Sequence, residues 1–292
     1  MEFARPDRPP RDLWSLPIAW REQGEAAMQD FLDRWPRDFD GPWITNEPLL
    51  ALTEGDPYEV GQYRDEWGCV FENIQAGVIG EVKEPLLRDW SRLEDLRPPV
   101  EALSFDVEAV NDRCRASDRF MMAACCPRLF ERLQFLRGTE ALYMDLARRP
   151  AELDELIRIV HEFYCAELEA WARTDVDALG IMDDWGSQQG LLMAPKRWRE
   201  LFRPLYADYT RIAREAGKKF FMHSDGCIFD IYEDLIEIGV DAVNSQLFCM
   251  DIEEIGRRFA GRITFWGEID RQWILPEGTE QDCRDAVARV VQ

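Results

Sequence analysis

The chain has 292 residues, of which 46% are hydrophobic and 32% are charged, a composition typical of a folded globular protein rather than a disordered one. Its formal net charge of -22 repels nucleic-acid phosphates and anionic lipids, which argues against nucleic acid or a membrane surface as a partner. The amino terminus shows no signal peptide and the apolar runs are far too short to cross a bilayer, so we expect a cytoplasmic protein.

The N-terminal third of the chain has little regular patterning. Residues 1–40 are rich in proline, arginine and aspartate, and we interpret them as an arm packed over a body formed by residues 41–292. Residues 21–35 have a helical pattern and residues 42–45 have the composition of a short strand. Residues 80–99 are predicted to be loop and turn.

From residue 119 onward, short apolar runs alternate with amphipathic stretches. The apolar runs predict buried strands, and the stretches between them predict helices that prolines open and glycines end. The predicted strands cover residues 119–125, 177–182, 219–223, 240–244 and 262–266, and the predicted helices start at Pro150, Pro195, Ile228 and Asp251. This alternation predicts an α/β fold with a parallel sheet, whose functional edge lies at the carboxyl ends of the strands.

Polar side chains that can bind a metal, move a proton or hold a substrate follow these predicted strands. They are Asp183, Asp184, His223, Asp225, Asn244, Gln246, Glu268 and Asp270. Since the loops that leave the strands of an α/β barrel share one mouth, the series predicts a single acidic site there.

Structural roles remain open for several of these residues. His223 could be a satisfied structural histidine, and the adjacent carboxylates Asp183 and Asp184 could cap the helical turn that follows them. His161 and Cys165 lie four residues apart on the helix after Pro150, but no third ligand completes that face, which favours a core or surface role over a metal site.

Several enzyme classes are disfavoured by missing motifs. The chain has no phosphate-binding glycine loop, no G-x-G-x-x-G after a strand, and no G-x-S-x-G turn of a serine hydrolase. Its eight cysteines show no paired spacing, so we interpret them as thiols.

Several separated motifs carry a family resemblance. They are Asp183-Asp184-Trp185-Gly186, Phe221-Met222-His223-Ser224-Asp225-Gly226, the run from Tyr63 to Gly68, and Gly267-Glu268-Ile269-Asp270. Together they resemble the uroporphyrinogen decarboxylase superfamily over nearly the whole chain. The resemblance implies a single (β/α)8 TIM barrel over residues 41–292, and we expect this chain to end before the last strand and helix of that barrel. It also implies one of two chemistries, either cofactor-independent decarboxylation of tetrapyrrole acetate groups or zinc-dependent methyl transfer between a corrinoid protein and a thiol.

The decarboxylase branch is matched in part. Asp65 stands where the decarboxylases have the aspartate that holds the pyrrole nitrogens, and Arg21 could stand for the first arginine of their amino-terminal motif. Glu25 replaces the second arginine, and Gln134-Phe135-Leu136 falls where the active-site tyrosine is expected. Replacing a guanidinium with a carboxylate disfavours a substrate that bears many carboxylates. A carboxy-lyase of porphyrin biosynthesis is therefore the alternative hypothesis.

The methyltransferase branch has a His-x-Cys metal motif. Here His223-Ser224-Asp225 places a carboxylate where that thiolate would be, and Cys227 follows two residues later. Imidazole and carboxylate together still bind zinc, although they form a harder site. Our leading hypothesis is metal-assisted methyl or one-carbon transfer in a corrinoid-linked system, with His223, Asp225 and Cys227 as metal ligands.

This hypothesis assigns the remaining roles. The catalytic residues would be Asp65, Asp183, His223 and Glu268, and the substrate-binding residues would be Arg21, Asp184, Asn244 and Gln246. The expected cofactors are zinc or another divalent metal and a corrinoid carried by a partner protein, with a small-molecule substrate and a possible homodimer. A third hypothesis is a non-catalytic barrel that binds a corrinoid protein or a small ligand.

Overall fold

A computed structural model describes residue 3 and residues 6–291. The chain divides into two compact units. Of the described residues, the helical unit comprises 6–124 and 129–176, and the sheet unit comprises residue 3, 125–128 and 177–291. The predicted division into an arm, residues 1–40, and a barrel, residues 41–292, stays a prediction.

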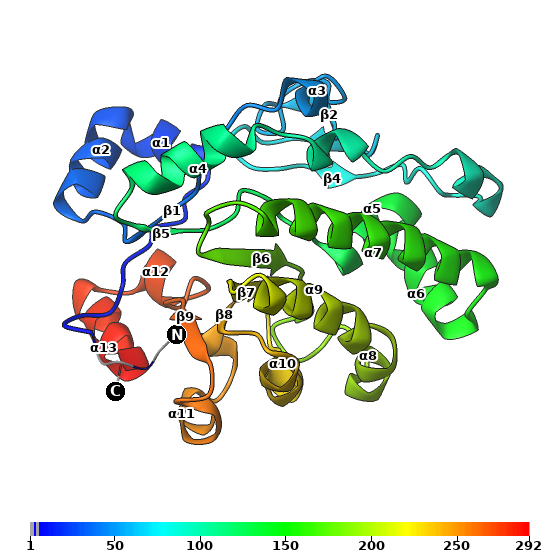
Figure 1. Ribbon diagram of the computed structural model, residues 1–292. Coiled ribbons are helices and arrows are strands. Elements are labelled where there is room, and N and C mark those ends of the chain that lie inside the picture. The colour runs from blue at the N-terminus through cyan, green and yellow to red at the C-terminus, as the bar shows by residue number, and fades with distance from the viewer. Residues whose placement is uncertain (1–2, 4–5, 292) are drawn as a thin grey trace. The chain divides into compact units, whose positions relative to one another are not determined.

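Four parallel strands form the centre of the sheet unit, in the order in which they occur along the chain (Figure 1). They are β6 (Ala178–Met182), β7 (Lys219–Ser224), β8 (Ala242–Ser245) and β9 (Thr264–Gly267). Every residue of β7 after Lys219 is buried, as expected for an apolar strand inside a parallel sheet. The register places His223 opposite Met182 on one side and Asn244 on the other, so the strands end at a common edge.

Helices follow each of these strands, as the alternating sequence pattern predicts. They are α8 (Pro195–Leu201), α9 (Arg203–Glu215), η3 (Phe229–Ile231), α10 (Tyr232–Ile238), η4 (Leu247–Cys249), α11 (Ile252–Phe259), α12 (Ile274–Glu277) and α13 (Glu280–Val291). Helix α9 packs on β7 and lies beside α10 (Figure 1). The predicted start of α11 is confirmed, since Asp251 Oδ1 accepts the backbone N–H of Glu254 at 2.8 Å.

The single helix predicted from Pro195 to Gly217 is instead two helices. Helix α8 ends at Leu201 and α9 begins at Arg203, with Phe202 between them. Pro204 has no N–H to donate, and its ring would collide with the preceding helical turn. It is tolerated because it lies in the first turn of α9, so the break falls directly before it.

The helical unit contains most of the short elements. They are α1 (Pro17–Gln23), α2 (Glu25–Arg34), β1 (Phe39–Asp40), α3 (Glu47–Leu50), β2 (Gly61–Arg64), β3 (Val70–Asn73), β4 (Glu81–Val82), η1 (Trp90–Asp95), η2 (Val100–Leu103), α4 (Val107–Ala116), β5 (Phe120–Met121), α5 (Leu129–Arg137), α6 (Thr139–Arg148) and α7 (Ala151–Ala172). Helix α5 packs against α6 and α7 and contributes fully buried leucines to the core.

No helix in the described residues of either unit is long and apolar enough to span a membrane.

Local predictions were least accurate in the helical unit. The helix predicted over residues 21–35 is broken at Gly24, whose φ of 84° is left-handed, and residues 42–45 form no strand. The strand predicted over residues 119–125 is reduced to Phe120–Met121. The antiparallel sheet β2-β3-β4 was not predicted, because β2 is mostly exposed and lacks the apolar alternation that marks a half-buried strand.

Candidate metal centre and adjoining pocket

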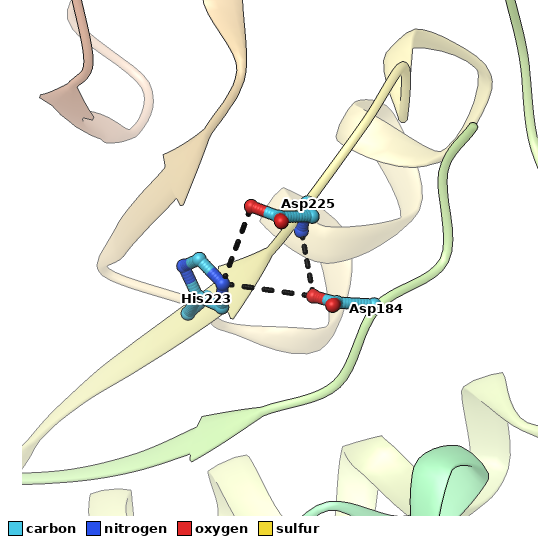
Figure 2. A group of neighbouring side chains, drawn as sticks. All are labelled: Asp184, His223 and Asp225. Atoms are coloured by element: carbon cyan, nitrogen blue, oxygen red, sulfur yellow. Dashed lines mark hydrogen bonds and ion pairs between the residues drawn. The ribbon is translucent and has the colours of Figure 1, made fainter. Parts of the chain in front are cut away.

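Three side chains meet at the carboxyl edge of the parallel sheet. Asp184 follows β6, His223 lies in β7 and Asp225 directly follows β7 (Figure 2). Each offers one ligand atom, and these atoms lie within 4.8 Å of one another. His223 Nε2 is 3.6 Å from Asp184 Oδ1 and 3.5 Å from Asp225 Oδ1. One nitrogen and two oxygens therefore face a common point.

The orientation of His223 is fixed from the neighbouring strands. Asn244 donates from Nδ2 to the carbonyl oxygen of Trp266 at 2.7 Å, so its Oδ1 is the atom that faces His223 Nδ1 at 2.5 Å. An amide oxygen only accepts hydrogen bonds, so Nδ1 carries the proton. In the neutral imidazole, the lone pair of Nε2 then points toward the two carboxylates. Metal-binding histidines are typically held by an outer partner in this way.

The two aspartates differ in their remaining contacts. Asp184 Oδ1 accepts the backbone N–H of Asp225 at 2.8 Å. Asp225 Oδ1 is buried and has no hydrogen-bond partner among the described residues. Burial raises the pKa of Asp184, and the negative charge of Asp225 acts in the same direction. A buried acceptor without a donor is unfavourable, and a cation at the common point would relieve it.

Glu268 and Arg271 complete the charged group. The Arg271 guanidinium contacts Asp225 Oδ2, and its Nε lies 3.9 Å from Glu268 Oε2. Burial raises the pKa of Glu268, while the charge of Arg271 opposes that rise. Three carboxylates, Asp184, Asp225 and Glu268, face the guanidinium of Arg271, and the charge of Arg128 also acts on Asp184. The excess of carboxylates favours a cation at the common point.

A pocket lies beside this charged group. It encloses about 370 Å³, part of it open to solvent, and Glu268 and Arg271 line it together with Gln188, Gln246 and Phe248. Gln188 Nε2 donates to Gln246 Oε1 at 2.7 Å. The lining of this pocket offers several hydrogen-bond donors and acceptors.

Two glycines allow the loops that carry the aspartates to touch. Gly226 has a φ of +78°, and a Cβ at this position would lie 2.1 Å from the carbonyl carbon of Gly186. Gly186 N donates to the carbonyl oxygen of Asp225 at 3.0 Å, and Cys227 N donates to that of Ser187 at 2.7 Å. The loop after β6 and the loop after β7 are thus held backbone to backbone.

Comparison with known proteins identifies the family. Residues 67–292 match the sequence profile described as Uroporphyrinogen decarboxylase (URO-D). This chain belongs to the uroporphyrinogen decarboxylase family. The predicted family membership is confirmed, and the family is one of enzymes.

Among solved structures, the chain is similar to a methyltransferase from Methanosarcina mazei. The two share 15% sequence identity with a TM-score of 0.56, and the match covers 77% of this chain and 66% of that chain. At this identity the likeness shows the fold alone, a mixed α/β fold with parallel strands. No curated protein matches the sequence significantly.

Most of the residues predicted for the site of this uroporphyrinogen decarboxylase family member lie at the sheet edge. Of the predicted metal ligands, His223 and Asp225 come together, whereas Cys227 is not part of the group. Asp184, predicted to bind substrate, takes the third position. Asn244 contacts the histidine, and Gln246 and Glu268 line the pocket.

Asp183 and Asp270 have local structural contacts. Asp183 is fully buried, its Oδ2 accepts the Tyr206 hydroxyl at 2.5 Å and its backbone N–H donates to the His223 carbonyl at 3.0 Å. Asp270 Oδ1 accepts the backbone N–H groups of Gln272 and Trp273 at 2.8 and 3.1 Å. Asp183 therefore braces the end of β7, and Asp270 shapes the loop that carries Arg271.

Asp65 and Arg21 belong to the helical unit. Asp65 Oδ1 accepts the backbone N–H groups of Trp67 and Cys69 at 3.1 and 2.7 Å, and Oδ2 contacts the buried guanidinium of Arg132. Asp65 therefore stabilises the turn between β2 and β3. Arg21 pairs with Glu59 at 2.5 Å on the surface.

Glu167, a partly buried residue of α7, is influenced by the charges of Glu66 and Arg132 and gives a pH-dependent prediction. Burial raises the pKa of Glu167 to about 8, and the charge of Glu66 adds to the rise. An unfolded glutamate ionises near pH ~4.3. The folded state therefore binds more protons between these values, so stability should fall as pH rises through this window and level off above about pH 8.

Replacing Glu167 with glutamine should remove this dependence. We expect Glu167→Gln to be more stable than the wild type above pH ~8, by on the order of 5 kcal/mol, with the difference vanishing below pH ~4. Urea unfolding across this pH range measures it. Glu169→Gln, an exposed neighbour on α7, is the matched control. Wild-type and Glu167→Gln stabilities that follow parallel pH profiles would contradict the prediction.

Three residues of these clusters were missed from sequence. Arg271 directly follows the run from Gly267 to Asp270, and its position next to an acidic motif was a usable signal. Gln188 had no distinguishing signal. Arg132 lies on α5 beside Glu131, and nothing in the local sequence marks its distant partner Asp65.

Proposed function

We propose that this chain binds a divalent cation, zinc or another, through Asp184, His223 and Asp225 and uses it for methyl or one-carbon transfer. The main support is that three ligand atoms converge on one point. In addition, Asp225 Oδ1 is buried and has no hydrogen-bond donor among the described residues. One imidazole and two carboxylates suit zinc and also harder divalent ions.

The chemistry follows from the positions of the side chains. A bound divalent cation lowers the pKa of a methyl acceptor's X–H group and stabilises its anion. Glu268 lines the pocket beside the charged group, and its raised pKa suits it to receive the acceptor's proton. Gln188 and Gln246 hold the acceptor with their amides. The acceptor atom X, after giving its proton to Glu268, would form the new bond to the methyl carbon, while the bond between the methyl group and the donor breaks and its electron pair stays on the donor.

The proposal includes a partner and an architecture. A corrinoid protein is the proposed methyl donor, supported by the family and by the likeness to a methyltransferase. The four parallel strands and their helices are proposed to be part of a (β/α)8 barrel whose mouth carries the site. The proposal also includes a cytoplasmic location, a small-molecule substrate and a homodimer.

Decarboxylation is the less supported of the family's two chemistries. It assigns to Asp65 the binding of pyrrole N–H groups, yet both carboxylate oxygens of Asp65 already bind donors within the helical unit. Anaerobic incubation with uroporphyrinogen decides the matter. Less carboxylated products that disappear in Asp65→Asn would favour the decarboxylase over our proposal. A non-catalytic barrel would show no turnover with either class of substrate.

Metal binding is the direct test of the proposal. We expect the purified protein to bind about one zinc ion, His223→Ala to abolish binding, and Asn244→Leu to weaken it by about 10- to 100-fold because the imidazole loses its outer partner. Equilibrium dialysis with metal analysis measures all three. His161→Ala removes the chain's other imidazole, in the helical unit, and should bind zinc as the wild type does. Equal zinc binding by His223→Ala and wild type would refute the assignment.

A further inference from the structure

Arg271 stands between the candidate metal centre and the pocket. Its guanidinium contacts Asp225 Oδ2, while Asp225 Oδ1 faces His223 Nε2 at 3.5 Å. The same side chain lines the pocket and is 44% exposed. Asp225 is therefore shared, with one oxygen turned toward the proposed cation and the other held by a resident positive charge.

A divalent cation and Arg271 would compete for this carboxylate. Both would lie within a few ångströms of Asp225 and would repel each other across a partly buried region, where charges interact more strongly than in water. Arg271 is the guanidinium in contact with Asp225, while the charge of Arg128 acts on the neighbouring Asp184. While Arg271 holds Asp225, it should weaken cation binding.

The pocket offers Arg271 another partner. A guanidinium has five N–H donors, and the contact with Asp225 uses one of its terminal nitrogens. A carboxylate accepts such donors in pairs and is the anion best matched to this geometry. The neighbouring pocket, with the Gln188 and Gln246 amides on its wall, has room for a small carboxylic acid.

We propose that Arg271 couples the two sites, acting as the counter-ion of Asp225 without metal and as the receptor for a substrate carboxylate when metal is bound. The cation and a small carboxylate would then bind cooperatively. The cation draws Asp225 out of the Asp225–Arg271 contact, and the carboxylate draws Arg271 out of it. This inference rests on the proposed function. It adds a positioning residue, Arg271, and a substrate class, small carboxylic acids.

Calorimetric titration with Zn²⁺, with and without succinate as the probe, tests the coupling. Arg271→Met should bind Zn²⁺ about tenfold more tightly than the wild type, since the repelling charge is gone. Succinate should tighten zinc binding by the wild type several-fold and leave Arg271→Met unchanged. By linkage, zinc should raise the affinity of the wild type for succinate by the same factor. Arg271→Lys, which keeps the charge but loses the planar fork, should retain weak zinc binding and lose most of the succinate effect.

The matched control is Arg284→Met. It removes one positive charge from the same unit, where Arg284 pairs with Glu280 on α13, and should leave both titrations unchanged. Zinc affinity in Arg271→Met that equals or falls below that of the wild type would overturn the inference, as would an equal succinate effect in both proteins. If neither wild type nor Arg271→Met bound zinc, the proposed metal function itself would fail, which is a distinct result.

Discussion

Replacing Arg132 with methionine is expected to destabilise the helical unit by about 3–5 kcal/mol, because the buried carboxylate of Asp65 then has no positive partner. Arg132 and Asp65 are 5% and 4% exposed. The guanidinium contacts Asp65, lies 3.3 Å from Glu66 and sits 5.2 Å from the centre of the Trp67 ring. Methionine keeps the packing volume but leaves Asp65 without its cation. Chemical denaturation followed by circular dichroism measures the loss.

Two further variants test whether the loss comes from the buried charge of Asp65. Arg115→Met removes an exposed arginine of the same unit, which pairs with Asp112 and Asp175, and should cost less than about 1 kcal/mol. Adding Asp65→Asn to Arg132→Met should recover part of the stability, since the amide oxygen can keep its backbone donors without a charge. A loss in Arg132→Met no larger than in Arg115→Met would show that the buried pair contributes little.

Gly226→Ala is expected to have the second large effect, on both stability and metal binding. An L-residue at this left-handed position costs about 1–2 kcal/mol, and the contact of its Cβ with the Gly186 backbone adds to that cost. The shift that relieves the contact must move Asp225, the preceding residue. We therefore expect a clear drop in the free energy of unfolding together with at least about tenfold weaker zinc binding.

The control for Gly226→Ala lies in the same region of the sheet unit. A Cβ at Gly190 would meet nothing within 4 Å, and its φ is not left-handed. Gly190→Ala should thus change stability by less than about 0.5 kcal/mol and leave zinc binding intact. Normal zinc affinity in Gly226→Ala would mean that the backbone contact does not position Asp225.

The sheet unit was more predictable from sequence than the helical unit. Apolar runs predicted β6 to β9 within a few residues, because buried parallel strands are apolar on both faces. The same reasoning predicted that His223 and Asp225 lie at the edge formed by the carboxyl ends of the strands. It could not choose Asp184 over Cys227 as their companion, since that choice depends on how the Gly186 and Gly226 backbones meet, which sequence spacing does not encode.

The missed parts depend on contacts between distant segments. The pairing of Asp65 with Arg132 joins residues 67 positions apart, and no local pattern marks it. Arg271 likewise reaches across 46 positions to Asp225. Periodicity reports which face of an element is buried, whereas ion-pair partners are set by the tertiary fold.

The hydrogen bonds from Trp266 through Asn244 to His223 separate the candidate centre into a fixed part and an exchangeable part. The imidazole is aimed by β7, β8 and β9, so its direction is set by the register of the sheet. The carboxylates come from the loops beyond the strands. Substitutions in those loops can therefore change the hardness of the ligand set, from thiolate to carboxylate or back, while the sheet keeps the histidine aimed at the same point.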